Sequence, residues 1–509
     1  MLHPTLSTLP GEVLEATLQQ LDYISLLQCY SVCKLFKTTI DESSELQYII
    51  ELAHDGMIDH HSLGLSHAER LNRLRDLRTA WNNLAWKTQS VIPMHGLCHA
   101  YELVEGLFVK GNGANNVSMS WLPSSTKEGH EIHREDLKMQ ARDFAIDPGQ
   151  NLIVFIDDAT SNAAFAPDGR IINLHLRTIS THEAHESASQ PVLKFTIPPN
   201  NVLGTFVRTV MLELAEDMLA VFVCTWNYRL LIWNWKKDIL VIDSYLPGHE
   251  LPRLTWDFSF ITPRAYIMTS REANGSIEIF GIESETSKPP TPIASLQLPE
   301  LDENVTPRSI TTHTGPLNTP SSNQLFVRSP ESRMHVICIQ YNISFSPQGR
   351  YCMFIRNGTF LSYLSLHASG KTPAGTQVPW KAWGPKNTRF SINKTPFAWL
   401  RYVHGQRVVY PQETGNSMGT LQIMDFNMWP DVSKSTDSKT VKTICTRPTT
   451  LNTAHIFQRR VVTHLPYRTI VREVPDNYSA FMIDEDKIIG LKAQGVDDEE
   501  LKELHVYTF

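Results

Sequence analysis

A strand unit that recurs along most of the chain constrains the fold more than any other feature of the sequence. From residue 95 onward, short runs rich in Val, Ile, Phe, Tyr and Trp alternate with turns of Gly, Pro, Asn and Asp, a pattern typical of β-strands. Each unit has a strand with an aromatic residue, a turn, a very apolar strand and a strand of alternating polarity. About seven units can be recognised, at residues 101–123, 142–180, 207–243, 255–283, 341–366, 397–427 and 478–509.

The apolar middle strands predict how these units are arranged. The runs LIVFI (152–156) and LAVFV (219–223) contain no polar residue, as expected for strands buried on both faces of a sheet. Radial repetition of three- or four-stranded sheets explains so many equivalent units better than a single sandwich does. The sequence therefore predicts an all-β, irregular, seven-bladed propeller-like domain over residues 95–509. A second β domain within its irregular part is the alternative.

Polar, proline-rich insertions make the spacing of the units irregular. The longest covers residues 284–340 and contains KPPTP followed by a tract rich in Thr, Ser, Asn and Pro. Such a composition predicts a long flexible loop, and whether it orders on binding a partner is left open. Shorter insertions cover residues 367–396 and 428–456.

The first part of the chain predicts helices instead. In LPGEVLEATLQQL (9–21), Pro10 falls in the first turn and Leu residues recur at helical spacing. Ser25 is expected to cap a second short helix, and a third follows over residues 33–43. Three short helices make a unit of about 40 residues, which is too small for a self-sufficient core. Its apolar surface is therefore expected to need a partner.

A helical linker is expected between this unit and the β domain. The segment 66–87 carries an apolar stripe at helical spacing, formed by Leu71, Leu74, Leu77, Trp81 and Leu84. We expect the stripe to pack against the N-terminal helices or the β domain. The expected division is 1–44, 45–94 and 95–509, so the fold class is α+β multidomain.

The N-terminal helices also carry a motif. The pattern LPxEVLxxxLxxL beginning at Leu9, followed by VCKxF at Val32–Phe36, resembles the F-box family. The helices that follow resemble those of a large group of fungal F-box proteins, which continue into an irregular β-propeller-like region. F-box domains bind the Skp-type adaptor of cullin–RING ubiquitin ligases. The resemblance implies the following adaptor-binding residues, at or behind the docking surface: Leu9, Pro10, Glu12, Val13, Leu14, Leu18, Leu26, Leu27, Val32, Cys33, Lys34 and Phe36.

The resemblance implies that the chain is the substrate-recognition subunit of a Skp–cullin–F-box ligase and is not an enzyme. Two alternatives remain open: an F-box protein that supports assembly without ubiquitination of a client, and a hydrolase or lyase on a propeller scaffold. On a propeller, the loops that enter the inner strands are the expected client face. Arg142 and Arg208 precede two such strands and are candidate client-binding residues for an acidic peptide. The alternative for each is an ordinary surface or interblade arginine.

Several other functions are disfavoured by composition and spacing. A net charge of -7 argues against a general nucleic-acid binder, and no apolar run is long enough to cross a membrane. The seven cysteines form no C-x-x-C pair, which favours a reduced, intracellular protein in the cytoplasm, the nucleus or both. His182 and His185 lie one residue too close for a metalloprotease motif, and a solvated loop is expected there. No catalytic residue, metal or cofactor is predicted.

Overall fold

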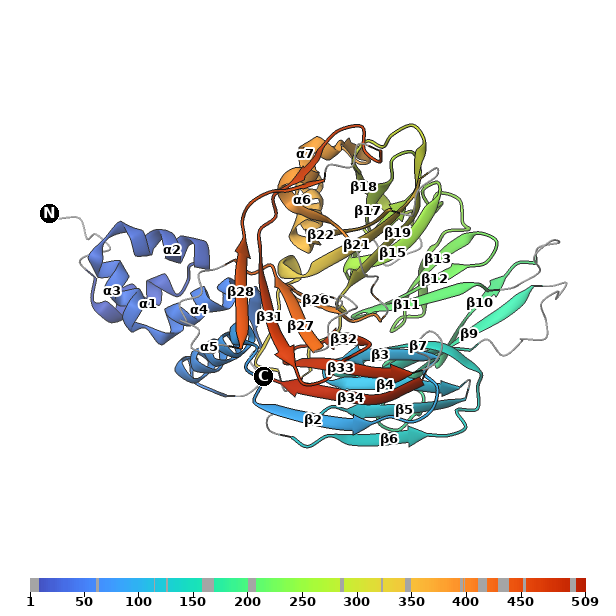
Figure 1. The fold of residues 1–509 in the computed structure, drawn as a ribbon, viewed down its shortest axis with the longest axis horizontal. Helices are drawn as coiled ribbons and strands as arrows, with labels where there is room; N and C mark the ends of the chain where they lie inside the picture. The colour runs from blue at the N-terminus through green and yellow to red at the C-terminus, as the bar shows by residue number, and fades with distance from the viewer. Residues whose placement is uncertain are drawn as a thin grey trace.

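The computed structural model describes residues 9–509 apart from 61–63, 114, 125–126, 158–168, 200–206, 284–287, 322–323, 344–348, 394–396, 398, 411–418, 429–438, 452–454 and 495–499. The helical N-terminal unit lies at one end of the molecule, and a large β domain forms the rest (Figure 1).

The N-terminal unit contains α1 (Gly11–Leu18), α2 (Tyr23–Val32), α3 (Lys34–Glu42) and α4 (Ser44–His54). Asp22, and not Ser25, caps α2. Its carboxylate accepts a hydrogen bond from the backbone N–H of Ser25 at 2.7 Å, and this bond lowers the pKa of Asp22. The expected Ser25 cap is therefore wrong, because the helix begins earlier and the acceptor lies three residues before Ser25.

The β domain is a propeller of seven blades, which confirms the predicted fold class and blade count. Four blades have four strands built from consecutive chain segments or nearly so, two have a fifth strand, and the last is completed by an N-terminal strand. The first strands of neighbouring blades contact one another around a central channel. We call the face formed by the turns between the first and second strands of each blade the lower face, and the opposite face the upper face.

Blade 1 contains β3 (Ala100–Val104), β4 (Leu107–Gly113), β5 (Asn116–Trp121) and β6 (His130–Arg134). Blade 2 contains β7 (Ala141–Asp147), β8 (Leu152–Asp157), β9 (Arg170–Thr178) and β10 (Val192–Ile197). Blade 3 contains β11 (Thr209–Ala215), β12 (Met218–Cys224), β13 (Tyr228–Asn234) and β14 (Ile239–Asp243). Blade 4 contains β15 (Thr255–Thr262), β16 (Ala265–Ser270), β17 (Ser276–Gly281), β18 (Thr291–Gln297) and β23 (Thr376–Val378). Blade 5 contains β19 (Val305–Thr314), β21 (Met334–Ile343), β22 (Gly349–Arg356) and β24 (Thr388–Ile392). Blade 6 contains β25 (Val403–His404), β26 (Arg407–Tyr410), β27 (Gly419–Asp425), β31 (Tyr467–Val474) and β28 (Thr440–Cys445). Blade 7 contains β32 (Ala480–Ile483), β33 (Lys487–Gln494), β34 (Glu500–Thr508) and β2 (Thr88–Pro93).

The remaining elements are α5 (His67–Asn83), α6 (Asn357–Ala368), α7 (Trp380–Asn387), the short 3₁₀ turns Pro148–Gln150 and Pro330–Ser332, β1 (Met57–Asp59), β20 (Phe326–Arg328), β29 (Thr449–Leu451) and β30 (Val461–Thr463). The helices α6 and α7 are inserted between β22 and β24 of blade 5.

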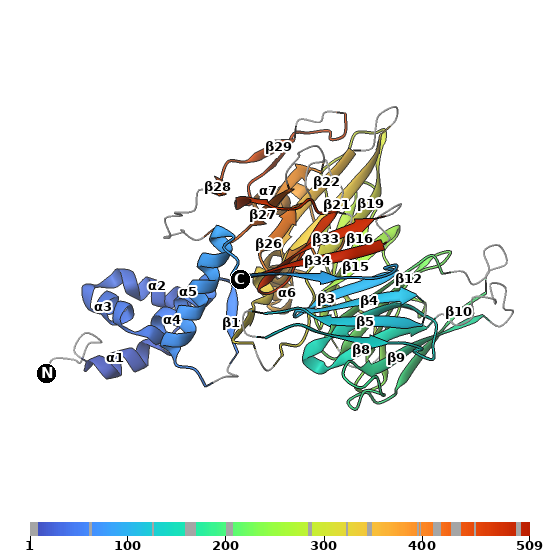
Figure 2. The same ribbon diagram turned by 60° about the horizontal axis from the view of Figure 1, so that its bottom comes forward.

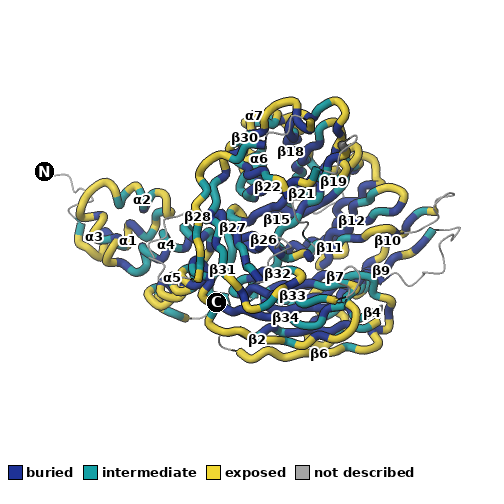
Figure 3. Tube along the Cα trace, in the orientation of Figure 1, coloured by how far each residue is buried: buried dark blue, intermediate teal, exposed yellow. Residues whose placement is uncertain are grey.

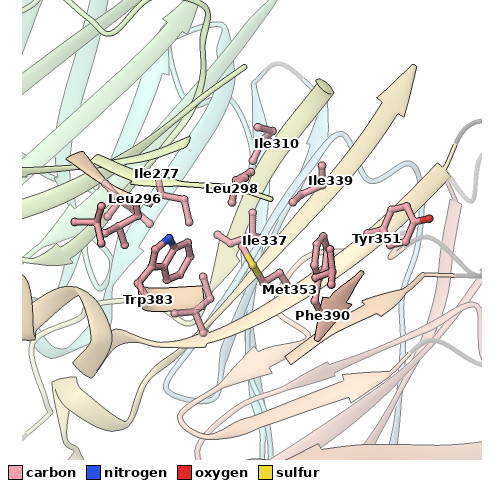
Figure 4. Close-up of a cluster of buried hydrophobic side chains, with 14 of the residues drawn as sticks. Ile277, Leu296, Leu298, Ile310, Ile337, Ile339, Tyr351, Met353, Trp383 and Phe390 are labelled. Carbon is pink, nitrogen blue, oxygen red and sulfur yellow. The ribbon is translucent and has the colours of Figure 1, made fainter. Parts of the chain in front are cut away.

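The hydrophobic core lies between neighbouring blades. As predicted, the second strands are buried on both faces, since every residue of β8 and β16 is buried. The cluster between blades 4 and 5 joins Ile277 and Leu296 to Ile337 and Met353, and Trp383 of α7 closes it (Figure 4). The inserted helices therefore cover an apolar surface of these two blades.

The N-terminal strand β2 closes the ring of blades. It pairs antiparallel with β34, from Thr88 opposite Thr508 to Pro93 opposite Glu503, and so forms the outer strand of blade 7. The range 45–94 was expected to be a helical linker, but it contains the strands β1 and β2 beside α4 and α5. The linker is therefore partly built into the propeller.

The prediction of a long loop over residues 284–340 is wrong. The described part of this range contains β18 of blade 4, β19 and the first residues of β21 of blade 5, and β20. The strand β20 pairs with β1 of the linker. Pro292 and Pro307 both lie beside register shifts, where a missing backbone N–H does not interrupt the strand ladder. The alternative of a second β domain in this region is wrong as well, because these strands complete the propeller.

The unit expected at residues 341–366 is also partly wrong. Its third strand is replaced by the helix α6, in which Phe360 is buried. A short apolar run such as FLSYLSL fits a buried helix or a strand equally well when only periodicity is considered.

Residues 315–321 and 324–330, which together we call the brace, cross the lower face of the propeller. Leu317 forms an isolated bridge with Ala215 of blade 3. The side chain of Asn318 donates to Glu105 of blade 1, and the N–H of Thr319 donates to Asp147 of blade 2 at 3.1 Å. The brace then forms β20, which pairs antiparallel with β1 of the linker. A segment of blade 5 thus connects the far side of the propeller to the linker.

The stripe on α5 fills both of its expected roles. Leu71 and Leu74 pack against α4, while Trp81 and Leu84 pack against blades 6 and 7. Trp81 stacks on Phe509 with ring centroids 4.1 Å apart, and the Arg407 guanidinium lies 4.6 Å from its ring. Figure 2 shows α5 and β1 between the N-terminal helices and the propeller. The N-terminal unit is therefore held at the lower side of the propeller.

Candidate docking surfaces

The N-terminal helices have a small core formed by part of the predicted docking residues. Leu14, Leu18, Leu26 and Phe36 are buried together with Ile40 and Leu46. These four predicted residues lie behind the surface and fix the mutual positions of α1, α2 and α3. Leu9 and Leu27 are partly buried.

The remaining predicted residues lie on the surface of the same helices. Pro10, Glu12, Val13, Val32, Cys33 and Lys34 are exposed. Val13 is 48% exposed and Val32 is 69% exposed, although both are apolar. Ile24 and Leu35 are exposed apolar residues of α2 and α3 that were not predicted. Several exposed apolar side chains on so small a unit mark an interaction surface. We call Val13, Ile24, Val32 and Leu35 the hook surface, and Figure 3 shows how much of these helices is exposed.

Ion pairs fix the positions of α4 and β1 relative to α5. The Arg78 Nε donates to Asp55 at 2.8 Å, and Arg70 pairs with Asp59 at 2.9 Å. Burial raises the pKa of Asp55, but hydrogen bonds from His54 and Arg78 outweigh burial and hold this pKa below its ordinary value. These ion pairs therefore hold the helices that carry the hook surface against α5.

Arg142 and Arg208 lie together at the upper face. The Arg142 Nη2 donates to the backbone carbonyl of Arg208 at 2.9 Å and links blade 2 to blade 3. Burial lowers the pKa of Arg142, while Arg208 is exposed. Arg142 thus makes an interblade contact, and Arg208 presents its side chain to solvent.

Aromatic and aliphatic side chains are exposed on the upper-face turns of blades 3 and 4 near Arg208. They are Trp226, Tyr245, Leu246 and Leu254, which we call the upper patch. The Arg229 guanidinium lies 4.4 Å from the ring centre of Tyr245. Arginine interleaved with exposed aromatic residues is typical of protein recognition surfaces. Sequence analysis missed this patch, because its residues come from separate turns.

Two other arginines, neither of them predicted, reach the central channel. Arg401 has a backbone φ of +66° and holds Glu102 through two ion-paired contacts. Arg333 donates to the backbone carbonyl of Phe260 at 2.8 Å and to that of Gly315. Arg401 and Glu102 are 299 positions apart, so local spacing gives no sign of their contact.

Acidic side chains also line the channel, but they leave little space. Burial raises the pKa of Asp143 and of Asp257 to about 7. Glu213 accepts from the N–H of Phe260 at 2.7 Å, and Asp257 accepts from the N–H of Thr312 at 2.6 Å. The cavity beside Glu102, Glu213 and Arg401 measures about 40 Å³, which is room for about one or two water molecules. Glu213 and Asp257 therefore accept hydrogen bonds from the backbone, and the cavity beside Glu213 is too small for an organic substrate.

The described residues contain no group of His, Cys, Asp and Glu side chains able to hold a metal ion. Among the same residues, no helix is long and apolar enough to cross a membrane. His185 is buried, its Nε2 lies 2.8 Å from the carbonyl oxygen of Gln150, and its ring meets Trp235 edge-on. The expected solvated loop is therefore wrong at His185, which packs against blade 3.

The comparisons with known proteins identify the N-terminal unit. The F-box domain family matches residues 6–48. No curated protein matches the chain. A chain of the mitotic checkpoint complex is 6% identical and has a TM-score of 0.36, with 82% of this chain and 93% of that chain covered. The N-terminal domain of Nup159 is 10% identical and has a TM-score of 0.34, with 83% of this chain and 95% of that chain covered. Hsv2p of Kluyveromyces lactis is 9% identical and has a TM-score of 0.34, with 80% of this chain and 96% of that chain covered. Likenesses this distant assign no function, and the propeller rests on the strand order of the chain itself.

Proposed function

We propose that this F-box protein, whose C-terminal region is a seven-bladed β-propeller, is the substrate-recognition subunit of a Skp–cullin–F-box ubiquitin ligase. F-box domains in general bind Skp-type adaptors, and an F-box joined to a propeller is typically a non-enzymatic adaptor. The hook surface is the observation that carries the proposal, because it leaves four apolar side chains of the F-box without a described partner. An adaptor that covers these side chains would remove apolar area from water and so stabilise the complex.

The proposed role requires no catalytic side chain in this chain. A receptor that binds ligase and client at once raises the concentration of client lysines near the ubiquitin-loaded enzyme. The F-box is attached at the lower side of the propeller, so it does not cover the upper face. We propose that Arg142, Arg208 and the upper patch contact this client, which is expected to carry negative charge beside an apolar residue.

A binding assay with purified Skp-type adaptor tests the docking proposal. We expect Val32→Glu to weaken binding at least tenfold, since a charge would enter the centre of an apolar interface. Val441→Glu is a matched control, because Val441 is 62% exposed on β28 of the propeller, compared with 69% for Val32. The double substitution Leu9→Ala/Pro10→Ala is expected to weaken binding as well. Failure of the intact chain to bind the adaptor would contradict the proposal.

Depletion of the protein in cells distinguishes a ligase receptor from an F-box protein with an assembly role. A receptor predicts proteins that accumulate on depletion and return to normal levels with the wild-type chain or Val441→Glu, but not with Val32→Glu. If adaptor binding is intact and no protein accumulates, the assembly role is favoured instead.

A further inference from the structure

A cavity of about 230 Å³ lies between the brace and the lower face of the propeller. It is separate from the hook surface and the upper patch. The turns of blades 3, 4, 6 and 7 form one side, and the brace and Ile58 of β1 form the other. A molecule in this cavity would therefore touch the linker, the brace and the propeller at once.

The walls of the cavity are mainly apolar. Four prolines contribute to them, together with Ile58, Leu317 and Val327; the prolines are Pro263, Pro316, Pro320 and Pro330. An apolar cavity of ~150 Å³ is known to hold a benzene molecule. The space here accommodates a single ring with a small substituent.

One cation in the wall has no hydrogen-bonding partner among the residues that the structure describes. Arg328 lines the cavity, and its Nε is buried without a hydrogen bond. Burial lowers the pKa of Arg328, which shows that the surroundings disfavour its charge. A buried guanidinium N–H without an acceptor is costly unless a ligand supplies that acceptor.

Three carboxylates act on Arg328 through their charge, but none of them is hydrogen-bonded to it. They are Glu485, which itself lines the cavity together with Glu216, and Asp55 and Asp425. Glu485 lies 3.3 Å from the Nε2 of His404, Asp55 is paired with Arg78 at 2.8 Å, and Asp425 is paired with Arg407 at 3.1 Å. Arg333, which also lines the cavity, donates to backbone carbonyls. The wall thus offers two guanidinium groups to which no described carboxylate is hydrogen-bonded.

We propose that this cavity binds a small carboxylate with a compact apolar body, such as a single ring. The carboxylate would pair with Arg328, since a guanidinium matches its planar geometry. The ring would lie against the prolines and Leu317. Because Ile58 and the brace form the opposite wall, the bound molecule would also hold the linker against the propeller. This inference does not depend on the proposed ligase function.

Titration calorimetry of the full-length chain with benzoate tests the proposal. We expect saturable binding of one benzoate, at least tenfold tighter than that of benzyl alcohol, which has the same ring and no charge. Arg328→Gln is expected to weaken benzoate binding at least tenfold. Arg459→Gln is the control and should leave binding unchanged, because Arg459 is 83% exposed and lies outside the cavity. Equal binding by wild type and Arg328→Gln would overturn the proposal.

A second variant blocks the cavity without removing the charge. Ile58→Trp places a larger side chain at the wall, and we expect it to abolish benzoate binding while the circular dichroism spectrum stays native. Acetate, which carries the charge without a ring, should compete only weakly. If acetate competes as well as benzoate, the site is a simple anion site and the proposed ligand class is wrong.

Discussion

At the scale of single residues, the channel of the propeller buries carboxyl groups whose charge the fold disfavours. Asp257 is 3% exposed, and burial raises its pKa from 3.8 to about 7, while the N–H of Thr312 and the nearby His313 partly oppose this rise. Between these two pH values the folded protein retains a proton that the unfolded chain has released. The contribution of Asp257 to stability is therefore complete below about pH 4 and is lost as the pH rises through 7.

We predict that Asp257→Asn stabilises the protein at pH 8 relative to wild type and has a smaller effect at pH 5. The amide keeps an oxygen that can accept from Thr312 and has no charge to bury. The difference in free energy of unfolding should grow by up to about 1.4 kcal/mol per pH unit between pH 5 and about pH 7 and stay constant above it. Urea unfolding of both proteins at several pH values measures it. The exposed Asp238→Asn serves as the control, and a pH-independent difference for Asp257→Asn would contradict the prediction.

The residues of the F-box show which positions of the domain can be recognised from the spacing of a sequence motif. Leu14, Leu18, Leu26 and Phe36 carry much of the recognisable spacing because they form the helical core. Exposed positions such as Ile24 and Leu35 have no such spacing, since the partner that would cover them belongs to another molecule. Spacing therefore identified the domain more completely than it identified the hook surface.

At the scale of elements, the structure explains why strands in residues 284–340 were taken for a loop. Thr and Ser are common there, and Thr is a good strand former when its neighbours pack against it. Prolines, which argue against a central strand, lie beside bulges in this protein. The register shifts that accommodate them come from pairing with distant strands.

The strand β2 allows a prediction about truncation. A chain that begins at residue 66 keeps α5 and β2, whereas a chain that begins at residue 95 removes both. We predict that the second chain unfolds at a lower urea concentration, because it leaves the edge of β34 unpaired and exposes Phe509, on which Trp81 stacks. Comparison of their urea midpoints by circular dichroism tests this.

Equal midpoints for the two truncated chains would show that the ring closes without β2. The chain that begins at residue 66 controls for loss of the F-box itself. The result also decides whether the boundary expected between residues 94 and 95 separates independently stable parts.

At the scale of the whole molecule, the brace and the linker place the F-box at a fixed position below the propeller. β1 pairs with β20, and the backbone N–H of Ser329 donates to the carbonyl of Gly56 at 2.8 Å. In the proposed ligase, this arrangement would hold the client at a defined distance from the adaptor. Figure 2 shows β1 at the junction between the N-terminal helices and the propeller.

We predict that Ile58→Pro loosens this connection, because proline cannot donate to the ladder between β1 and β20. Small-angle X-ray scattering should report a larger radius of gyration and a broader distance distribution than for wild type. Ile58→Ala keeps the backbone N–H and is the matched control. Identical scattering for all three proteins would show that α5 alone fixes the F-box.

The sequence by itself determined the F-box motif, the helical start of the chain, the apolar second strands and a series of about seven strand units. These features depend on local periodicity, which is written in contiguous residues. Only the tertiary structure decided that β2 closes blade 7, that the brace crosses the lower face, and that Arg401 meets Glu102. It also decided that Arg328 faces a cavity in which its Nε has no hydrogen-bond acceptor among the described residues. Such contacts join residues that are far apart in the chain, and their partners are set by the packing of the blades, to which no local pattern corresponds.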